Sequence, residues 1–307
     1  MLAYTVRRFL GLLPALFVII TLSFFLVRLA PGGPFDQERA LPPQVRANLD
    51  RVYGLDQPLA LQYVHYLSRL ARGDLGPSFK LRDFSVSELI AAGLPVSATL
   101  GALALLLAVI LGIPLGVAAA SWHGRAADFG IGGFVALAVA LPSFVTGPLL
   151  ALLFGLYLHW LPVGGWEEGS PRYLILPVLT LGLPVAAYVA RLTRGGLLEV
   201  LRSNHIRTAR ARGLGEARIL LHHALRPALL PVVSYLGPAA AFVVTGSLVV
   251  ETVFGLPGTG RYLVQGAINR DYTLVMGMII VYGVLTLLLN FAADVLYGWL
   301  DPRVRHE

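Results

Sequence analysis

Residues 207–231, RTARARGLGEARILLHHALRPALLP, form a basic stretch between two segments apolar enough to lie in lipid. The stretch holds five arginines, two histidines and no lysine. Residues 206–212 and 216–225 predict two short helices, divided by Gly213–Leu214–Gly215. Anionic lipid, nucleic acid or a general positive bias of inner loops would each account for the charge. None of these requires small residues at the bend, where Ala209, Ala211 and Gly213 stand, whereas such residues let the surface of another protein approach the backbone closely.

The composition of the chain indicates an integral membrane protein. Of its 307 residues, 56% are hydrophobic and 13% are charged, whereas a soluble domain carries about 25% charged residues. The 33 glycines and 20 prolines fit this class, since both residues are commoner in transmembrane helices than in soluble ones. The chain has no cysteine, which excludes disulfides, iron–sulfur clusters and thiol chemistry within it.

Six stretches are long and apolar enough to cross a membrane as helices of roughly 20 residues. They are residues 9–29, 94–120, 129–158, 173–193, 228–250 and 273–299. The first could also be a cleaved signal peptide, because Arg7 and Arg8 precede it. Its apolar run is too long for a signal peptide and no A-x-A site follows, so we expect a retained helix. The sequence therefore predicts an all-α integral membrane protein with six transmembrane helices.

The charges are distributed unevenly between the two sides that these spans define. With both termini on the inner side, the inner segments hold thirteen arginines against six acids. The outer segments hold eleven basic residues against eleven acids. The positive-inside rule then places both termini and the loop over residues 191–227 in the cytoplasm. We expect a multi-pass protein of the cell inner membrane, with lipid and no nucleic acid among its partners.

The longest outer segment, residues 31–92, is predicted to be folded. Gln57–Pro58 resembles a helix start with proline at the first helical position. Apolar and aromatic residues then recur at helical spacing, at Leu59, Tyr63, Tyr66, Leu67 and Leu70. The pattern fits an amphipathic helix that lies on the membrane surface or on the helix bundle. A docking surface for an external partner is the second interpretation of the same residues.

Within the spans, glycine, proline and sparse charge are the notable features. Gly112 and Gly116 form a small-xxx-small pair that lets two helices approach closely, and LPSFVTGP at 141–148 predicts a broken helix. Asp294 lies near Asn290 in the last span, little more than one turn from its inner edge. An acid within a membrane is a functional candidate, but at this depth we expect a bond to a neighbouring helix or to the interface.

Two motifs could be mistaken for binding sites. GLPGTGRY at 255–262 resembles a phosphate-binding loop, but Arg261 and Tyr262 stand where that loop needs lysine and then serine or threonine. His222 and His223 are adjacent and point about 100° apart on a helix, without cysteine or carboxylate partners at ligand spacing. No nucleophile stands in a G-x-S-x-G motif. The sequence therefore predicts neither a nucleotide site, nor a metal site, nor a catalytic centre.

The basic stretch resembles the cytoplasmic coupling loop of ABC importer permeases. In that pattern, Glu-Ala-Ala is followed by three residues, a glycine, nine residues and Ile-x-Leu-Pro. The matching places hold Arg207, Thr208, Ala209 and Gly213, and then His223, Leu225 and Arg226, with Pro227 one residue on. The Glu, the first Ala and the Ile are missing. This variant is similar to the dipeptide and oligopeptide branch, which commonly reads TARAKGL and HALRPAL.

The resemblance extends over nearly the whole chain. Further stretches similar to that branch are GDLGPSF at 73–79, LGIPLGV at 111–117, LPSFVTG at 141–147, WLPVGGW at 160–166, VVETVFGLPGTGRYL at 249–263 and LDPRVR at 300–305. They resemble the first of the two permease types of the branch. The implied fold is the type I ABC importer transmembrane fold. The implied organisation is an N-terminal helix over 1–30, an extracytoplasmic segment over 31–92, a permease domain over 93–300 that contains the loop 195–227, and a cytoplasmic tail over 301–307.

The resemblance also implies a mechanism and a set of partners. This chain and a second homologous permease would form the pathway, and an extracytoplasmic solute-binding protein would deliver the solute. Two cytoplasmic ATPases would bind ATP and Mg, so that this chain needs no cofactor and performs no catalysis. Each ATPase would grip one coupling loop and pass its rigid-body motion to the helices. The expected solutes are di- and oligopeptides, with nickel chelates, glutathione and oligosaccharides as alternatives.

Two other classes of protein remain to be weighed against this resemblance. A stand-alone secondary carrier would follow an ion gradient, but no chain of Asp, Glu or His crosses the spans as a proton-driven carrier often needs. A membrane-embedded enzyme would need a polar constellation facing a cavity, and none stands out in the sequence. The residues that line a solute pathway cannot be assigned from spacing alone.

Overall fold

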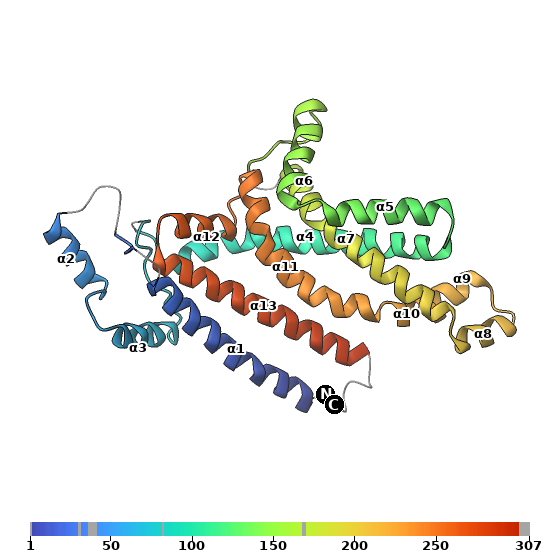
Figure 1. Ribbon diagram of the computed structural model, residues 1–307, viewed down its shortest axis with the longest axis horizontal. Coiled ribbons are helices and arrows are strands. Elements are labelled where there is room, and N and C mark those ends of the chain that lie inside the picture. Colours follow the sequence, from blue (N-terminus) through green and yellow to red (C-terminus); the bar gives the residue numbers. More distant parts are fainter. Residues whose placement is uncertain (1, 30–31, 36–41, 82, 168–169, 301–307) are drawn as a thin grey trace.

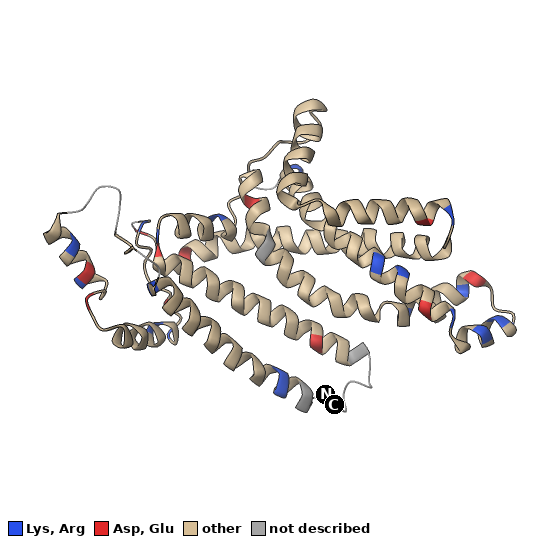
Figure 2. Cartoon of the chain, in the orientation of Figure 1, with Lys and Arg blue, Asp and Glu red and all other residues tan. Residues whose placement is uncertain are grey.

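The computed structural model describes residues 2–29, 32–35, 42–81, 83–167 and 170–300, and its regular elements are helices (Figure 1). The predicted tail over 301–307, with most of the LDPRVR motif, lies outside the described residues. Charged side chains gather toward the two ends of the helical bundle, and the middles of the long helices are almost free of them (Figure 2). This distribution is the one expected of helices that cross a membrane.

Four helices are individually long and apolar enough to span a membrane. They are α1 (Leu2–Leu29), α4 (Val86–Ser121), α7 (Arg172–Leu201) and α13 (Tyr272–Leu300). Two bent pairs qualify jointly, which brings the number of spans to as many as six. The first pair joins α5 (Ala126–Ala140) to α6 (Ser143–Leu150) and η1 (Ala151–Tyr157). The second joins the segment Glu216–Ala228 to α11 (Leu230–Phe254). Each of the six predicted stretches overlaps one of these helices or pairs, and the stretch 228–250 follows α11 rather than the segment Glu216–Ala228.

The predicted break at LPSFVTGP is a sharp one. α5 and α6 meet at Leu141–Pro142 and are bent by 107° relative to each other. Proline lacks the N–H that would continue the helix, so the chain turns there and α6 points away from α5 (Figure 1). The other pair bends by 48° near Leu229.

α4 and α7 form the tightest helix pair, and glycine permits it. A Cβ added at Gly112 would lie 2.6 Å from the Ala186 carbonyl oxygen, and one at Gly116 would lie 2.5 Å from that of Ala190. The predicted small-xxx-small contact is therefore confirmed. The main apolar core extends from this pair to α11, through residues such as Leu100, Leu176, Val243 and Phe254.

α13 lies between α1 and α11, and an ion pair joins its last turns to α1 (Figure 1). Arg8 Nη1 lies 3.1 Å from Asp294 Oδ2, at the end of the bundle where α7 also finishes. The structural role expected for Asp294, a bond to a neighbouring helix, is confirmed.

The segment between α1 and α4 contains two short helices, α2 (Pro43–Val52) and α3 (Leu59–Leu70). Pro58 is the N-cap of α3, one position before the helix, rather than its first residue. Tyr63 and Tyr66 pack against Phe24 of α1 and Tyr272 of α13. α3 therefore lies on the helix bundle, as the first interpretation of this segment predicted, whereas α2 buries no residue.

Candidate functional site

The basic stretch folds into a compact loop at the end of α7, called here the α8–α9 loop. It contains α8 (Asn204–Ala211), α9 (Glu216–Arg218), η2 (Ile219–Ala224) and α10 (Leu225–Ala228). The two predicted short helices are confirmed. Ile206 and Ile219 are fully buried against Leu197 of α7, together with Ala224 and Ala228. The loop is therefore fixed to the membrane helices by apolar packing.

The seven residues that match the coupling-loop pattern divide between two faces. Arg207, Thr208, Gly213, His223 and Arg226 are exposed, and Leu225 is half-buried. Ala209 is only 8% exposed and packs into the same cluster as Ile206. The small side chain at Ala209 thus serves packing within this chain, whereas Ala211 and Gly213 leave the outer side of the bend open.

Gly213 turns the chain between α8 and α9 in a left-handed conformation, with φ at +77°. Its N–H donates to the Arg210 carbonyl at 2.9 Å, and the Leu214 N–H donates to that of Ala209 at 3.3 Å. Residues with a Cβ adopt this conformation reluctantly, so the backbone itself favours glycine here. A Cβ added at Gly213 would meet nothing within 4 Å, so the outer side of the turn is free space in this chain.

An exposed ion pair joins the two helices on either side of the same turn. Arg210 Nε and Nη2 donate to the two carboxylate oxygens of Glu216 at 2.8 and 3.1 Å. The pair links α8 to α9, and both side chains are exposed. It holds the shape of the loop without contributing much to its stability.

A second charged cluster lies where α4, α5 and α7 meet. Arg194 of α7 donates from Nε and Nη2 to the two oxygens of Asp128 at 2.7 and 2.8 Å. His123 Nδ1 and the Gly124 N–H lie 3.1 and 3.0 Å from Asp128 Oδ2. The Asp128 side chain is 6% exposed and that of Arg194 is 36% exposed, so a nearly buried carboxylate is satisfied by a half-buried arginine. It ties the α4–α5 turn to α7 two turns before the α8–α9 loop begins.

Two cavities follow α7 toward the middle of the bundle. One, of about 680 Å³, lies between α5 and α7 and includes Arg191 and Arg194 in its lining. The other, of about 210 Å³, lies at the α5–α6 break and includes Tyr188 of α7 and Tyr235 of α11. Val139 lines both, so the two cavities adjoin.

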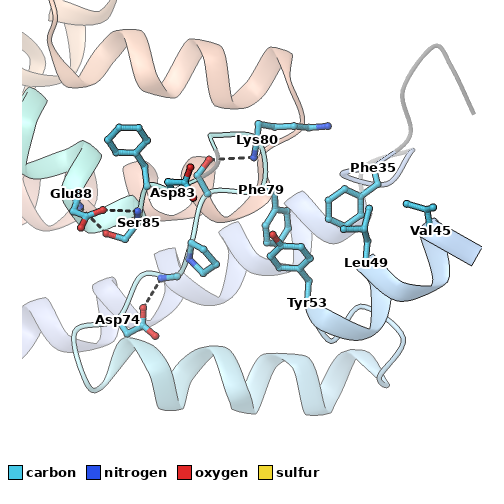
Figure 3. Close-up of a pocket in the computed structure, with 14 residues that line it drawn as sticks. Phe35, Val45, Leu49, Tyr53, Asp74, Phe79, Lys80, Asp83, Ser85 and Glu88 are labelled. Carbon is cyan, nitrogen blue, oxygen red and sulfur yellow. Dashed lines mark hydrogen bonds between the residues drawn. The ribbon is translucent and has the colours of Figure 1, made fainter. Parts of the chain in front are cut away.

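A third cavity, of about 1030 Å³, lies at the opposite end, between α2 and the loop over residues 74–85 (Figure 3). The rings of Phe35, Tyr53 and Phe79 form one wall, with centroids 4.6 to 5.7 Å apart. Asp74 accepts from Arg69 Nε at 2.9 Å and from the Gly76 N–H at 2.8 Å. These two donors hold the pKa of the Asp74 carboxyl below its ordinary range.

Asp271, at the start of α13, fixes the 74–85 loop. Its Oδ1 accepts from the N–H groups of Phe79 and Leu274 at 3.1 and 3.2 Å. Its Oδ2 accepts from the Lys80 N–H at 3.2 Å and from the Ser78 hydroxyl. Asp271 is 1% exposed, so a buried carboxylate holds this loop by hydrogen bonds.

The GLPGTGRY segment is a turn followed by α12 (Thr259–Ile268). Fully buried Glu251 accepts from the Gly260 N–H at 2.8 Å through Oε2, and its Oε1 has no hydrogen-bond partner among the described residues. A Cβ on Gly258 or Gly260 would collide with the Glu251 carboxylate. Close packing on this acid accounts for Gly258 and Gly260.

The sequence did not predict the Asp128–Arg194 pair or the buried acids Asp271 and Glu251. It also did not predict the tyrosine pair Tyr188 and Tyr235. Asp128 and Arg194 are 66 positions apart, and nothing local pairs them. One signal was available: Tyr188, Arg191 and Arg194 follow each other at intervals of three on α7, which places them on one helix face.

Long and broken apolar helices form the bundle, and a charged loop packs on one end of it. These features define a polytopic membrane protein with cavities beside its helices. Residues 112–306 match the family described as binding-protein-dependent transport system inner membrane component, and residues 1–81 match its N-terminal membrane component. The chain therefore belongs to this family, whose members are ABC importer permeases, and the resemblance seen in the sequence is confirmed.

Relatives match along their full length. The chain is 53% identical over 306 residues to the oligopeptide transport system permease protein OppB of Escherichia coli strain K12, covering 100% of both chains. It is 39% identical over 302 residues to the dipeptide transport system permease protein DppB of Bacillus subtilis strain 168, covering 98% of this chain and 97% of the relative. A solved structure of the MetNI methionine ABC transporter is similar in fold, with a TM-score of 0.58 at 19% identity, covering 69% of this chain and 96% of that chain.

Proposed function

We propose that this chain is one of two permease subunits of an ABC importer that takes up di- and oligopeptides. The observation that carries the substrate class is the 53% identity to an oligopeptide permease along the whole chain. The 39% identity to a dipeptide permease supports the same class. Nickel chelates, glutathione and oligosaccharides are the alternative solutes within the same kind of transporter.

In this proposal the α8–α9 end and both chain termini face the cytoplasm. The segment over 31–92 is extracytoplasmic, and the permease domain spans 93–300. A second homologous permease completes the pathway, and an extracytoplasmic binding protein delivers the peptide. Two ATPase subunits bind ATP and Mg²⁺ and perform all of the catalysis. The excess of arginine on one side of the predicted spans supports this orientation.

The α8–α9 loop is proposed to be the contact with one ATPase. Its outer face presents Arg207, Thr208, Gly213, His223 and Arg226, and these arginines would pair with acidic groups of the ATPase. Its inner face is packed on α7 through Ile206 and Ile219. A loop held in this way moves as one body with α7, so closure of the ATPases would reach the membrane helices.

Affinity purification of the chain from its native membrane under gentle conditions tests the assembly. The proposal expects a second permease, one or two phosphate-loop ATPases and a binding protein in the retained fraction. Recovery of the chain alone, under conditions that keep other complexes intact, would favour a stand-alone carrier.

Transport by the purified complex in liposomes tests the energy source and the solute class. Uptake of trialanine should require ATP and the binding protein and should persist without an ion gradient. Uptake driven by a proton or sodium gradient without ATP would contradict the proposal.

A further inference from the structure

The two adjoining cavities beside α7 form one groove, which reaches from the α5–α6 break to the α4–α5 turn. The wall on α7 includes Pro184, Tyr188, Arg191 and Arg194, and Val139 of α5 lines both cavities. The groove is open along the bundle, as shown by the exposure of Tyr188 (39%) and of Phe242 on α11 (61%). Lipid, a helix of another subunit or the transported solute would have to fill this space.

Two tyrosines give the part of the groove near the break a polar character. The rings of Tyr188 and Tyr235 lie 5.6 Å apart and are inclined by 34°. Neither hydroxyl has a hydrogen-bond partner among the described residues. Tyrosine hydroxyls in apolar surroundings normally have a partner. Acyl chains offer none, so these two groups favour an occupant with polar atoms.

Arg191 gives the other part of the groove an uncompensated positive charge. It is exposed, lies one helical turn from Tyr188 on the same face of α7, and has no ion-pair partner among the described residues. The other charged groups of this lining, Asp128 and Arg194, are bonded to each other. Arg191 lies near the inner end of α7, where the predicted span 173–193 meets the inner loop, so its guanidinium stands at the inner mouth of the groove. The free charge of the groove therefore complements an anionic group.

We propose that this groove is part of the solute pathway, and that Tyr188, Tyr235 and Arg191 are its polar contacts with the peptide. Arg191 binds a carboxylate, such as the C-terminus, and the two hydroxyls exchange hydrogen bonds with backbone amides. This assignment rests on the proposed function, since it takes the solute to be a short peptide. It supplies the pathway residues that could not be assigned from the sequence.

Thiol labelling tests the groove directly, because the natural chain has no cysteine. Tyr188→Cys and Tyr235→Cys are introduced singly into the complete transporter, with Leu106→Cys as the control. Leu106 is exposed on α4 and lies outside both cavities. A charged, membrane-impermeant methanethiosulfonate is applied from both sides. Both groove positions should react, trialanine should slow the reaction several-fold, and Leu106→Cys should stay unlabelled.

Labelling that fails at both groove positions would overturn the assignment, because it would place this face against lipid or against a helix of the second permease. Labelling that trialanine does not slow would also overturn it. Failure of the unaltered complex to take up trialanine would contradict the proposed function instead, so the two failures are distinguishable.

The charge of Arg191 is tested with trialanine and its C-terminal amide, both well below the concentration that saturates uptake. Arg191→Gln should lower the uptake rate of trialanine about tenfold and bring the rates for the acid and the amide together, because the variant lacks the charge that binds the carboxylate. Arg125→Gln is the matched control, because Arg125 is exposed at the same end of the bundle and lines neither cavity. Assembly of the complex checks folding. An unchanged preference for the acid in Arg191→Gln would overturn the role of Arg191.

Discussion

The two ends of the helical bundle are fixed to the membrane helices by different forces. At the α8–α9 end, fully buried Ile206 and Ile219 hold the loop, and its charged side chains are free to face outward. At the α2–α3 end, buried Asp271 holds the 74–85 loop through directional hydrogen bonds. Apolar packing has no directional preference, whereas a carboxylate with five donors fixes one geometry. The difference agrees with the proposed role of the α8–α9 loop, which is to move with α7 when an ATPase pulls on it, and with a fixed rim at the other end.

The largest expected effect on the stability of the α8–α9 loop comes from shortening a buried side chain that holds the loop on α7. Ile206→Ala should destabilise the docking of α8 by about 3 kcal/mol, because it removes a fully buried side chain and leaves a cavity. Amide hydrogen exchange over residues 204–211 should accelerate by about two orders of magnitude or more. The control is Arg207→Ala, one residue on and exposed. Equal exchange in the two variants would show that packing does not hold this loop.

The corresponding change at the opposite end is Asp271→Asn. The amide nitrogen would face an N–H donor in place of an accepting oxygen, which should cost about 2 kcal/mol locally. Amide exchange at residues 78–81 should accelerate, while exchange in α8 stays unchanged. Asp83→Asn is the control, since Asp83 lies on the same loop and outside this network. If exchange in α8 rose as well, the two ends would not be independent.

Variants of Gly213 test the shape of the α8–α9 loop separately from the apolar packing that holds the loop on α7. Gly213→Ala should strain the turn by about 1–2 kcal/mol because of the positive φ, whereas Gly215→Ala, at φ −66°, should be tolerated. Gly213→Trp should abolish transport while the protein stays in the membrane, because the bulky ring would occupy the space where a partner docks. Transport rates together with membrane content measure both effects. Normal transport by Gly213→Trp would contradict the assignment of the loop.

The exposed ion pair of the same loop should matter less. Arg210→Gln should change loop stability only slightly, because both partners are exposed to solvent, and the effect should shrink further in high salt. Limited proteolysis between α8 and α9 at low and high salt measures it. A loss comparable to that of Ile206→Ala would mean that charge, rather than packing, holds the loop.

The smallest effect concerns pH at the rim of the α2–α3 end. The folded pKa of Asp74 is lowered by Arg69 and by the Gly76 N–H, so its stabilising contribution is present above the ordinary pKa of about 4. That contribution is lost as the pH falls through the lower folded value. Exchange of the Gly76 amide should therefore lose protection in acid in the natural protein, and Asp74→Asn should lack this pH-dependent step. A step of the same size in Asp74→Asn would assign it to another group.

Local sequence patterns were sufficient where one element decides the outcome. The six apolar stretches, the break at Pro142, the Gly112 and Gly116 contact and the α8–α9 bend follow from composition and spacing. The pairing of Asp128 with Arg194 depends on the packing of helices far apart in the chain, so no local pattern contains it. The same holds for Asp271, which is buried only because the 74–85 loop returns to α13.

The sequence also could not show why a given position holds a small residue. Ala209 and Gly213 both stand at the bend, but Ala209 is small because Ile206 and its neighbours pack there, and Gly213 turns the backbone at positive φ. Spacing shows that small residues are present, and only the fold shows which side of them is occupied.

Photo-crosslinking within the assembled transporter tests the central claim most directly. A photoreactive amino acid is placed at Arg212, on the exposed side of the α8–α9 bend, or at Val52, which is 77% exposed on α2. The account predicts an adduct with an ATPase subunit from position 212 and none from position 52. An ATPase adduct from position 52, or an adduct from position 212 with the extracytoplasmic binding protein, would contradict it.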